Sequence, residues 1–597
     1  MAKSHAFLPL TQAECAARGW DYVDVVIVTG DAYVDHPSFA MAMIGRVLEA
    51  AGWRVAILSR PDWRSCAPWR AFGKPRLFFA ISPGNVDSMI NLYTANKKPR
   101  SEDDYAEGGQ RGGRPERAAV VYAQRAREAY PGVNVVIGGV EASMRRLAHY
   151  DYWSDTVKRS ILLDSKADLL AYGMGEKTVT ELARRMNEGT PAREIRGLRG
   201  TVYAASEADK ADGSICRLPS YEGIKSDKAA FLKAELLIHE NTDPRSAKTL
   251  VQQHAERLVV QNPPTEPATP EELAGWYALP FTRLPHPSYK KTVPAWEMIK
   301  DSITIHRGCG GGCSFCSLAL HQGRLIQSRP EGSVLQEARE VAKRSGGIIS
   351  DLGGPSANMY GASCARPGGD CARHSCLWPE ICPFFKHDQP RLAALMRRVR
   401  QEPGVKKALI NSGVRMDLAL ACPDYISELA AHHTGGQLSV APEHTDPAIL
   451  KLMHKPSPEK FASFSRQFLA ASAKAGKQQF LIPYFISAFP GADLKTAAAM
   501  ALELKRQGIR PRQINDFIPA PMEIATAAYY TGIDPHTGAK IHVPKGENER
   551  KLHRALLQYF KPENRLAALR ALRMAGMASA AKELFGGTGA RMHGPRR

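Results

Sequence analysis

The chain has 597 residues, and its 80 Lys and Arg against 60 Asp and Glu give a formal charge of +20. This length predicts several domains, while 44% hydrophobic and 23% charged residues are ordinary globular usage, which excludes a collagen, a coiled coil or wholesale disorder. No apolar run approaches the roughly 18 residues of a membrane span, and the first residues lack the apolar core of a signal peptide. We therefore expect a cytoplasmic protein with no membrane partner.

Residues 1–200 are interpreted as a Rossmann-like domain, because short apolar runs alternate with helix-like stretches as in a doubly wound parallel sheet. Ligands of such sheets bind outside the carboxyl ends of the strands, so glycines that close the runs are the first place to look for a pocket. The predicted strands are Val23–Thr29, Arg54–Leu58, Arg76–Ile81, Asn134–Ile137 and Asp168–Tyr172, and the closing glycines are Gly30, Gly138, Gly139, Gly173 and Gly175.

Two segments of this half look like connections. Between Asn96 and Arg117 basic and acidic residues interleave and glycines interrupt the stretch, which predicts a long surface loop. Residues 201–294 are predicted to be a connecting helical and linker region, because the strand–helix alternation weakens there. Its Pro-rich stretch Asn262–Pro270 suits an extended connection between domains.

A second strand–helix alternation fills residues 295–532 and predicts a partial (βα)6 barrel, which places its chemistry on the loops after the strands. A Cys-rich insertion at 360–385 interrupts it, and residues 533–597 are predicted to be a basic helical extension with a mobile tail. The fold class is therefore α/β. The six barrel strands are expected at Ser302–His306, Gly347–Asp351, Lys407–Asn411, Gln437–Ala441, Gln479–Tyr484 and Arg512–Phe517.

Seven of the 11 cysteines lie between residues 309 and 382, which in a chain without a secretion signal favours metal or cluster ligation over disulfides. Cys309, Cys313 and Cys316 form a C-x3-C-x2-C motif on a glycine-rich loop just after the first predicted barrel strand. Three thiolates on a four-iron cluster leave one iron open for a small molecule. The alternative is a structural zinc that recruits a fourth cysteine from the later set.

That later set is Cys364, Cys371, Cys376 and Cys382, which lie in the Gly- and Pro-rich insertion. Four thiolates are compatible with an auxiliary iron-sulfur cluster or with a structural zinc, and a metal staple would explain how so irregular a segment is ordered. Free surface thiols are the remaining alternative.

The C-x3-C-x2-C loop resembles the radical S-adenosylmethionine (radical SAM) superfamily, and longer strings resemble one family within it, the YgiQ-type proteins, also described as UPF0313-like. The resemblance spans roughly residues 20 to 570. The strings are His36–Phe39, Gly138–Ser143, His149–Ser154, Tyr172–Glu176, Asp351–Asn358 and Phe489–Gly491.

The resemblance implies that Cys309, Cys313 and Cys316 bind a [4Fe-4S] cluster whose open iron is chelated by SAM. It further implies a SAM site at Gly353 and Gly354, where Pro355 stands in place of the usual acid. The turn with Ser412 and Arg415 is expected to contact the SAM ribose and carboxylate, and Glu443 the ribose hydroxyls. The reducing electron would come from a flavodoxin- or ferredoxin-like donor.

The resemblance also compares the N-terminal sheet with cobalamin-binding domains, but Asp31–His36 lacks the Asp-x-His-x-x-Gly pattern that ligates cobalt, so cobalamin is not expected. The leading hypothesis is an enzyme that generates a 5′-deoxyadenosyl radical to act on an unidentified substrate. RNA modification by methylthiolation or methylation is the alternative, to which the +20 charge lends support. A non-catalytic, metal-stapled nucleic-acid-binding protein is the third hypothesis.

Overall fold

The computed structural model describes residues 7–206, 214–367, 371 and 373–586. The chain divides into two compact units, one of residues 1–301, 317–333 and 367–373, the other of residues 302–316, 334–366 and 374–597. The predicted tail after Gly586 lies outside the described residues. None of the helices within the described ranges combines the length and the apolar character that a membrane span requires.

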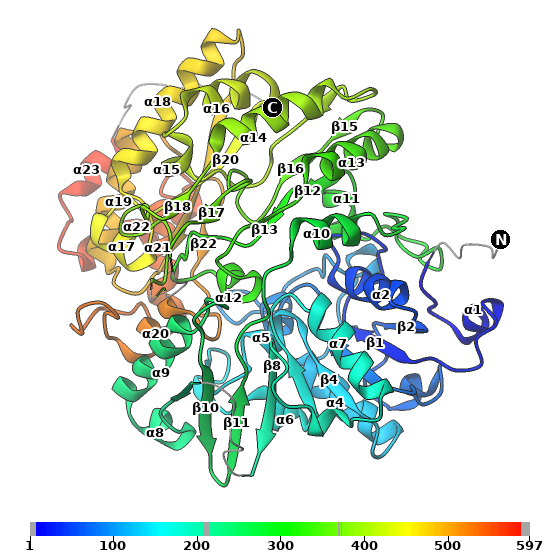
Figure 1. The fold of residues 1–597 in the computed structure, drawn as a ribbon. Helices are drawn as coiled ribbons and strands as arrows, with labels where there is room; N and C mark the ends of the chain where they lie inside the picture. The colour runs from blue at the N-terminus through cyan, green and yellow to red at the C-terminus, as the bar shows by residue number, and fades with distance from the viewer. Residues whose placement is uncertain (1–6, 207–213, 368–370, 372, 587–597) are drawn as a thin grey trace. The chain divides into compact units, whose positions relative to one another are not determined.

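The N-terminal unit is organised around one sheet, in which nine strands of the described chain follow the order β2-β1-β3-β4-β7-β8-β11-β10-β9 (Figure 1). All five residues of β1 are buried, as expected for a strand with both sheet faces covered. The strands are β1 (Val25–Thr29), β2 (Val55–Ser59), β3 (Phe78–Ser82), β4 (Val135–Ile137), β7 (Leu169–Ala171), β8 (Thr201–Ala205), β9 (Ile215–Arg217), β10 (Thr249–His254) and β11 (Arg257–Gln261).

Helices pack against this sheet in pairs: α2 lies beside α7, and α4 lies beside α6. The unit also contains the hairpin of β5 (His149–Asp151) and β6 (Thr156–Lys158). Its α-helices are α1 (Gln12–Ala17), α2 (Ala40–Ala50), α3 (Ser88–Leu92), α4 (Ala118–Ala129), α5 (Gly139–Ser143), α6 (Ile161–Ser165), α7 (Glu176–Asn187), α8 (Tyr221–Ser226), α9 (Lys228–Glu240), α10 (Pro270–Tyr277), α11 (Pro294–Ile299) and α12 (Leu318–Gln322). Short elements are η1 (Ala67–Arg70), η2 (Glu107–Gly109), η3 (Ala192–Glu194) and β14 (Gln327–Ser328).

The doubly wound sheet is confirmed for its first five strands, which are parallel. Residues 201–294 differ from the prediction of a helical connecting region, because β8 to β11 extend the same sheet through antiparallel β7–β8, β8–β11 and β10–β11 pairs. The reason is that Val202, Leu250 and Val259 bury their side chains at 0% exposure by pairing with an existing sheet edge, a distant partner that local patterning does not reveal.

The C-terminal unit confirms the predicted partial barrel, since six strand segments pair in parallel in their order along the chain. β12 pairs with β16, β15 with β19, and β20 with β21 and then β22, while a bridge from Val414 to Val440 links the two halves. The bounds are β12 (Ser302–Thr304), β13 (His306–Arg307), β15 (Ile348–Ile349), β16 (Asp351–Gly353), β19 (Lys407–Ala408), β20 (Gln437–Glu443), β21 (Phe480–Ser487) and β22 (Asn515–Asp516).

Helices follow these strands and share one apolar core with them, to which α13, α14, α16 and α18 contribute. The predicted C-terminal helices form a second core with α19, the helix that precedes the last strand. The helices of this part are α13 (Glu331–Arg344), α14 (Gln389–Gln401), α15 (Met416–Ala419), α16 (Pro423–Glu428), η4 (Leu429–His433), α17 (Pro447–Met453), α18 (Pro458–Lys474), α19 (Leu494–Arg506), α20 (Ile524–Thr531), α21 (Glu547–Leu557), η5 (Pro562–Asn564), α22 (Arg565–Met574) and α23 (Ala580–Phe585).

Candidate functional site

The three-cysteine loop follows β13 and is fixed by hydrogen bonds from segments distant in sequence. The Cys376 N–H donates to the Gly310 carbonyl at 2.9 Å, and the Ser375 hydroxyl donates to the Gly311 carbonyl at 2.6 Å. At the end of α17, His454 Nδ1 lies 2.9 Å from the Gly312 carbonyl oxygen. These contacts hold the backbone of the loop at three consecutive glycines.

The loop has the donor set and the free space that a cluster needs. A Cβ atom on Gly311 would stand 3.3 Å from Cys309 Sγ and 3.9 Å from Cys313 Sγ, so glycine keeps the space beside two of the sulfurs open. The guanidinium of Arg415 places Nη1 3.7 Å from Cys313 Sγ. These residues fit an iron-sulfur cluster. In the described structure, however, no three His, Cys, Asp or Glu side chains are arranged to hold a single metal ion.

Arg415 is buried, and most of its guanidinium is bound within the chain. Its Nε donates to Asp417 Oδ1 at 3.1 Å and its Nη2 to Asp417 Oδ2 at 2.6 Å. Asn358 fixes the Arg415 backbone, since Arg415 N–H donates to Asn358 Oδ1 and Asn358 Nδ2 donates to the Arg415 carbonyl. The bidentate edge expected to bind the SAM carboxylate thus binds Asp417, which sequence reasoning missed.

The glycine turn after β16 lies against two polar side chains. A Cβ atom on Gly353 would stand 2.6 Å from Ser412 Oγ, and one on Gly354 would stand 2.6 Å from the ring of His306. The Ser412 hydroxyl donates to Asp351, whose pKa is raised by burial. The structure therefore brings Gly353 and Ser412 together and adds a buried carboxyl group, while contact of Gly353, Gly354 and Ser412 with SAM stays a prediction.

Glu443 ends β20 with a φ of 68°, a left-handed conformation that a residue with a side chain adopts at a cost. Its carboxylate lies 3.6 Å from Lys455 Nζ, and burial raises the pKa of Glu443. Backbone strain of this kind gathers at ligand sites. Lys455 follows α17 and was not singled out from the sequence, because a lone lysine after a helix carries no distinctive signal.

The Cys-rich insertion is closed by the antiparallel pair β17 (Ser363–Cys364) and β18 (Phe385–Lys386). Within it the Cys382 N–H donates to the Cys376 carbonyl at 2.8 Å. Cys371 is assigned to the other compact unit. A metal on Cys364, Cys371, Cys376 and Cys382 stays a prediction, whereas the contacts of the insertion with the Gly310–Gly311 carbonyls assign it a role in holding the first loop.

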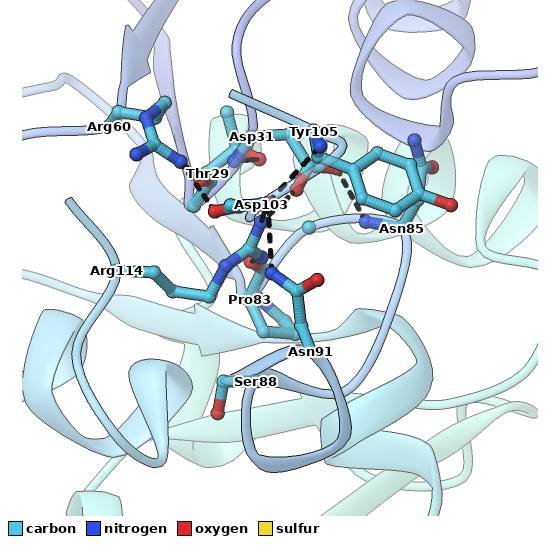
Figure 2. A network of polar contacts seen from close by, with 12 residues as sticks. Thr29, Asp31, Arg60, Pro83, Asn85, Ser88, Asn91, Asp103, Tyr105 and Arg114 are labelled. Carbon is cyan, nitrogen blue, oxygen red and sulfur yellow. Dashed lines mark hydrogen bonds and ion pairs between the residues drawn. The ribbon is translucent and has the colours of Figure 1, made fainter. Parts of the chain in front are cut away.

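In the N-terminal unit, the point where the strand order reverses lies between β1 and β3, and the chain itself fills it. Figure 2 shows Arg114 between Asp31, which follows β1, and Asp103, with Nη2 to oxygen distances of 2.7 Å and 3.5 Å. Arg114 also donates to the Pro83 carbonyl after β3, and its side chain is 0% exposed. The expectation that Asn96–Arg117 is a surface loop is therefore wrong for Arg114 and Asp103. Charge patterning does not reveal ion pairs between distant residues.

This arrangement does not fit a corrinoid. Cβ atoms on Gly30 and Gly84 would stand 2.9 Å and 2.7 Å from Arg114 Nη1, so the guanidinium is packed directly against both turns. His36 is buried, and its Nε2 lies 3.1 Å from Arg283 Nη1, a cation that opposes binding of a second cation. Arg114 thus fills the crevice and Arg283 lies beside the histidine, while the expectation that cobalamin does not bind stays a prediction.

Three family models match most of the chain. The radical SAM N-terminal model covers residues 7–302, the radical SAM superfamily model covers residues 303–496, and a domain of unknown function, DUF3362, covers residues 512–585. With the barrel and its three-cysteine loop, these matches place the protein among the radical SAM enzymes.

Curated relatives define the family more narrowly. A UPF0313 protein of Geobacter sulfurreducens is 48% identical, with 98% of this chain and 97% of that protein covered. A UPF0313 protein of Bradyrhizobium diazoefficiens is 47% identical, with 96% of this chain and 90% of that protein covered. YgiQ of Escherichia coli K12 is 44% identical, with 94% of this chain and 84% of that protein covered. The chain belongs to the UPF0313 family, to which YgiQ also belongs.

Solved structures show more remote likenesses. The radical SAM methyltransferase TsrM from Kitasatospora setae, with cobalamin and a [4Fe-4S] cluster bound, has a TM-score of 0.49 at 14% identity, covering 93% of this chain and 100% of that one. The cobalamin-dependent radical SAM enzyme OxsB has a TM-score of 0.48 at 9% identity, and the match covers 94% of this chain and 76% of the OxsB chain. Likenesses this weak do not indicate what this chain binds.

Proposed function

We propose that this protein binds a [4Fe-4S] cluster through Cys309, Cys313 and Cys316 and cleaves SAM reductively to act on an unidentified substrate. The observation that carries the proposal is the three-cysteine loop, opened by glycines and fixed at the carboxyl end of the first barrel strand. When bound, such a cluster supplies one electron that splits SAM into methionine and a 5′-deoxyadenosyl radical.

The side chains around the loop prepare this chemistry. The Arg415 guanidinium contacts Cys313 Sγ, and Asp417 keeps the guanidinium in position. Glu443 and Lys455 are buried polar groups beside β20, suited to hydroxyl and carboxylate groups of SAM. The Gly353–Gly354 turn packs its backbone against Ser412 and His306, which fixes its position beside the first barrel strand.

The test is anaerobic reconstitution with iron and sulfide, followed by electron paramagnetic resonance with and without SAM. We expect a cluster signal that SAM perturbs in the parent protein and in Cys66→Ala, a control outside the motif. The triple change Cys309→Ala, Cys313→Ala and Cys316→Ala is expected to lose it. A triple variant that keeps the SAM-perturbed signal would overturn the assignment.

RNA as the substrate is the weaker alternative. In the basic segment Asn96–Arg117, Arg114 is buried and Arg117 lies 3.2 Å from the Asp151 carboxylate, which leaves fewer cations for phosphates. RNA binding would weaken by about 0.7–0.9 log units per log unit of salt for each phosphate contacted. A salt series with total cellular RNA decides this, and an absence of binding at low salt rejects RNA while leaving the cluster proposal intact.

A further inference from the structure

The N-terminal unit contains a pocket at the carboxyl end of β7. The turn after β7, the segment after α9, the Pro-rich segment 264–268 and α12 line it. All of these belong to the same compact unit. The pocket lies at Gly173, one of the strand-closing glycines, and therefore where ligands of doubly wound sheets are found.

Arg324 lines this pocket, and two of the three nitrogens of its buried guanidinium lack hydrogen-bond partners within the described ranges. The residue is 6% exposed, and its Nε and Nη1 atoms have no hydrogen-bond partner within the described ranges. Asp243 interacts with it electrostatically, but that carboxylate is held by Arg245 at 2.7 Å and 3.0 Å. Buried guanidinium N–H groups without acceptors are costly, and an anion in the pocket would offer acceptors to Arg324.

The end of helix α7 supplies a second, independent feature that favours an anion. Gly175 is the N-cap of this 12-residue helix, and its cap receives no side-chain hydrogen bond. Met174, Glu176 and Lys177 line the pocket, so the positive end of the helix dipole lies at its wall. Two acidic residues are in the lining: Glu266, which is paired with Arg199 at 2.9 Å, and Glu176 in the first turn of α7.

The rest of the lining sets the shape of the ligand. Tyr172, Met174, Trp276, Leu320 and Leu325 present aromatic and aliphatic surface to the pocket. A small molecule that fits has an anionic group at one end and an apolar body. The wall formed by α12 begins at Leu318, two residues after Cys316, so it continues the cysteine loop along the chain.

We propose that this pocket is a binding site for a small molecule that carries a phosphate or a carboxylate on an apolar body, with Arg324 as the residue that contacts the anion. The planar guanidinium fork matches both groups. The proposal does not rest on the radical chemistry, because binding can be measured on the full-length chain without a reconstituted cluster.

The test is isothermal titration calorimetry of the full-length protein with inorganic phosphate and pyrophosphate in one arm and benzoate in the other. We expect saturable binding in at least one arm. Binding of phosphate or pyrophosphate indicates a phosphate ligand, and binding of benzoate indicates a carboxylate ligand. Arg324→Met is expected to weaken it about tenfold or more, while Arg193→Gln, an exposed arginine outside the pocket, leaves it unchanged. Arg324→Lys keeps the charge without the fork and is expected to bind with intermediate affinity.

Thermal unfolding without ligand provides the second measurement. If Arg324 serves ligand binding and its buried charge costs stability, Arg324→Met is expected to melt at the parent's temperature or above it. The variant no longer buries a charge whose N–H groups lack acceptors. If Arg324 serves only to stabilise the fold, Arg324→Met is expected to melt at a lower temperature than the parent and to bind the anion unchanged. That result, or an absence of saturable binding in both arms at tens of millimolar probe, would overturn the proposal.

Discussion

Arg415 Nη1 lies 3.7 Å from Cys313 Sγ, although the two residues are 102 positions apart in the chain. The opposite edge of the same guanidinium is bound by Asp417. One side chain thus faces both a prospective cluster ligand and a buried carboxylate. Its replacement therefore affects folding stability as well as the cluster.

Arg415→Met is expected to lower the free energy of unfolding by about 3 kcal/mol, because Asp417 keeps a buried charge without its partner. Urea unfolding under anaerobic, reducing conditions measures this. The matched variant that combines Arg415→Met with Asp417→Leu removes both charges and is expected to recover much of the loss. Equal stability of the single variant and the parent would show that the pair contributes nothing.

Ser375→Ala tests whether the Cys-rich insertion holds the cysteine loop. The hydroxyl donates to the Gly311 carbonyl and accepts from the backbone N–H groups of Leu377 and Trp378 at 3.0 Å and 2.9 Å. Its loss is expected to cost about 1–3 kcal/mol and to lower the iron content after reconstitution. Ser427→Ala, on an exposed helix face, is the control, and equal iron content in the two variants would contradict this role.

Gly354→Ala places a methyl group 2.6 Å from the buried ring of His306. We expect a loss of about 1–3 kcal/mol, since neither the strand nor the ring can move freely. Gly332→Ala is the control, because its Cβ meets nothing within 4 Å and alanine is favoured in helix α13. Chemical unfolding of both variants decides this, and a Gly354→Ala protein as stable as the control would contradict the close packing.

The network in Figure 2 predicts that hydroxocobalamin leaves its absorption spectrum unchanged when mixed with the protein, because Arg114 fills the crevice between β1 and β3. Arg114→Met is expected to destabilise the chain by about 3 kcal/mol, since Asp31 and Asp103 lose their buried cation. A stoichiometric spectral shift of hydroxocobalamin with the parent protein would contradict the filled crevice. For the stability measurement on Arg114→Met, the exposed Arg193→Gln is the control.

Glu235→Gln tests a buried carboxyl group on α9. Burial raises the pKa of Glu235 to about 8, above an unfolded value near 4.5. A raised carboxyl pKa means that folding is opposed once the pH exceeds the unfolded value, and the penalty grows until the pH passes the folded value. The variant is therefore expected to be more stable than the parent by about 3 kcal/mol at pH 7, with a smaller difference at pH 5. Chemical unfolding of both proteins at pH 5 and pH 7 measures this difference in stability. A difference that does not change with pH would contradict a raised pKa at Glu235.

Local patterns in the sequence determined much of the fold. Each of the six barrel strands lies where its apolar run predicted it, because a strand between helices is recognised from its own few residues and their neighbours. The Cys309–Cys316 loop was likewise recognisable, since the spacing and the glycines of a ligand loop are contiguous. The glycine turn at Gly173 pointed to the pocket for the same reason.

Only the tertiary structure decided what depends on residues far apart in the chain. The edge strands β8 to β11, the burial of Arg114 by Asp31 and Asp103, and the binding of Asp417 by Arg415 in a backbone conformation fixed by Asn358 have no periodic or spacing signal. The identity of a charged residue in the sequence does not indicate whether its side chain is solvated or buried in an ion pair. Long-range pairing determines which of the two occurs, and with it which groups remain available to bind a ligand.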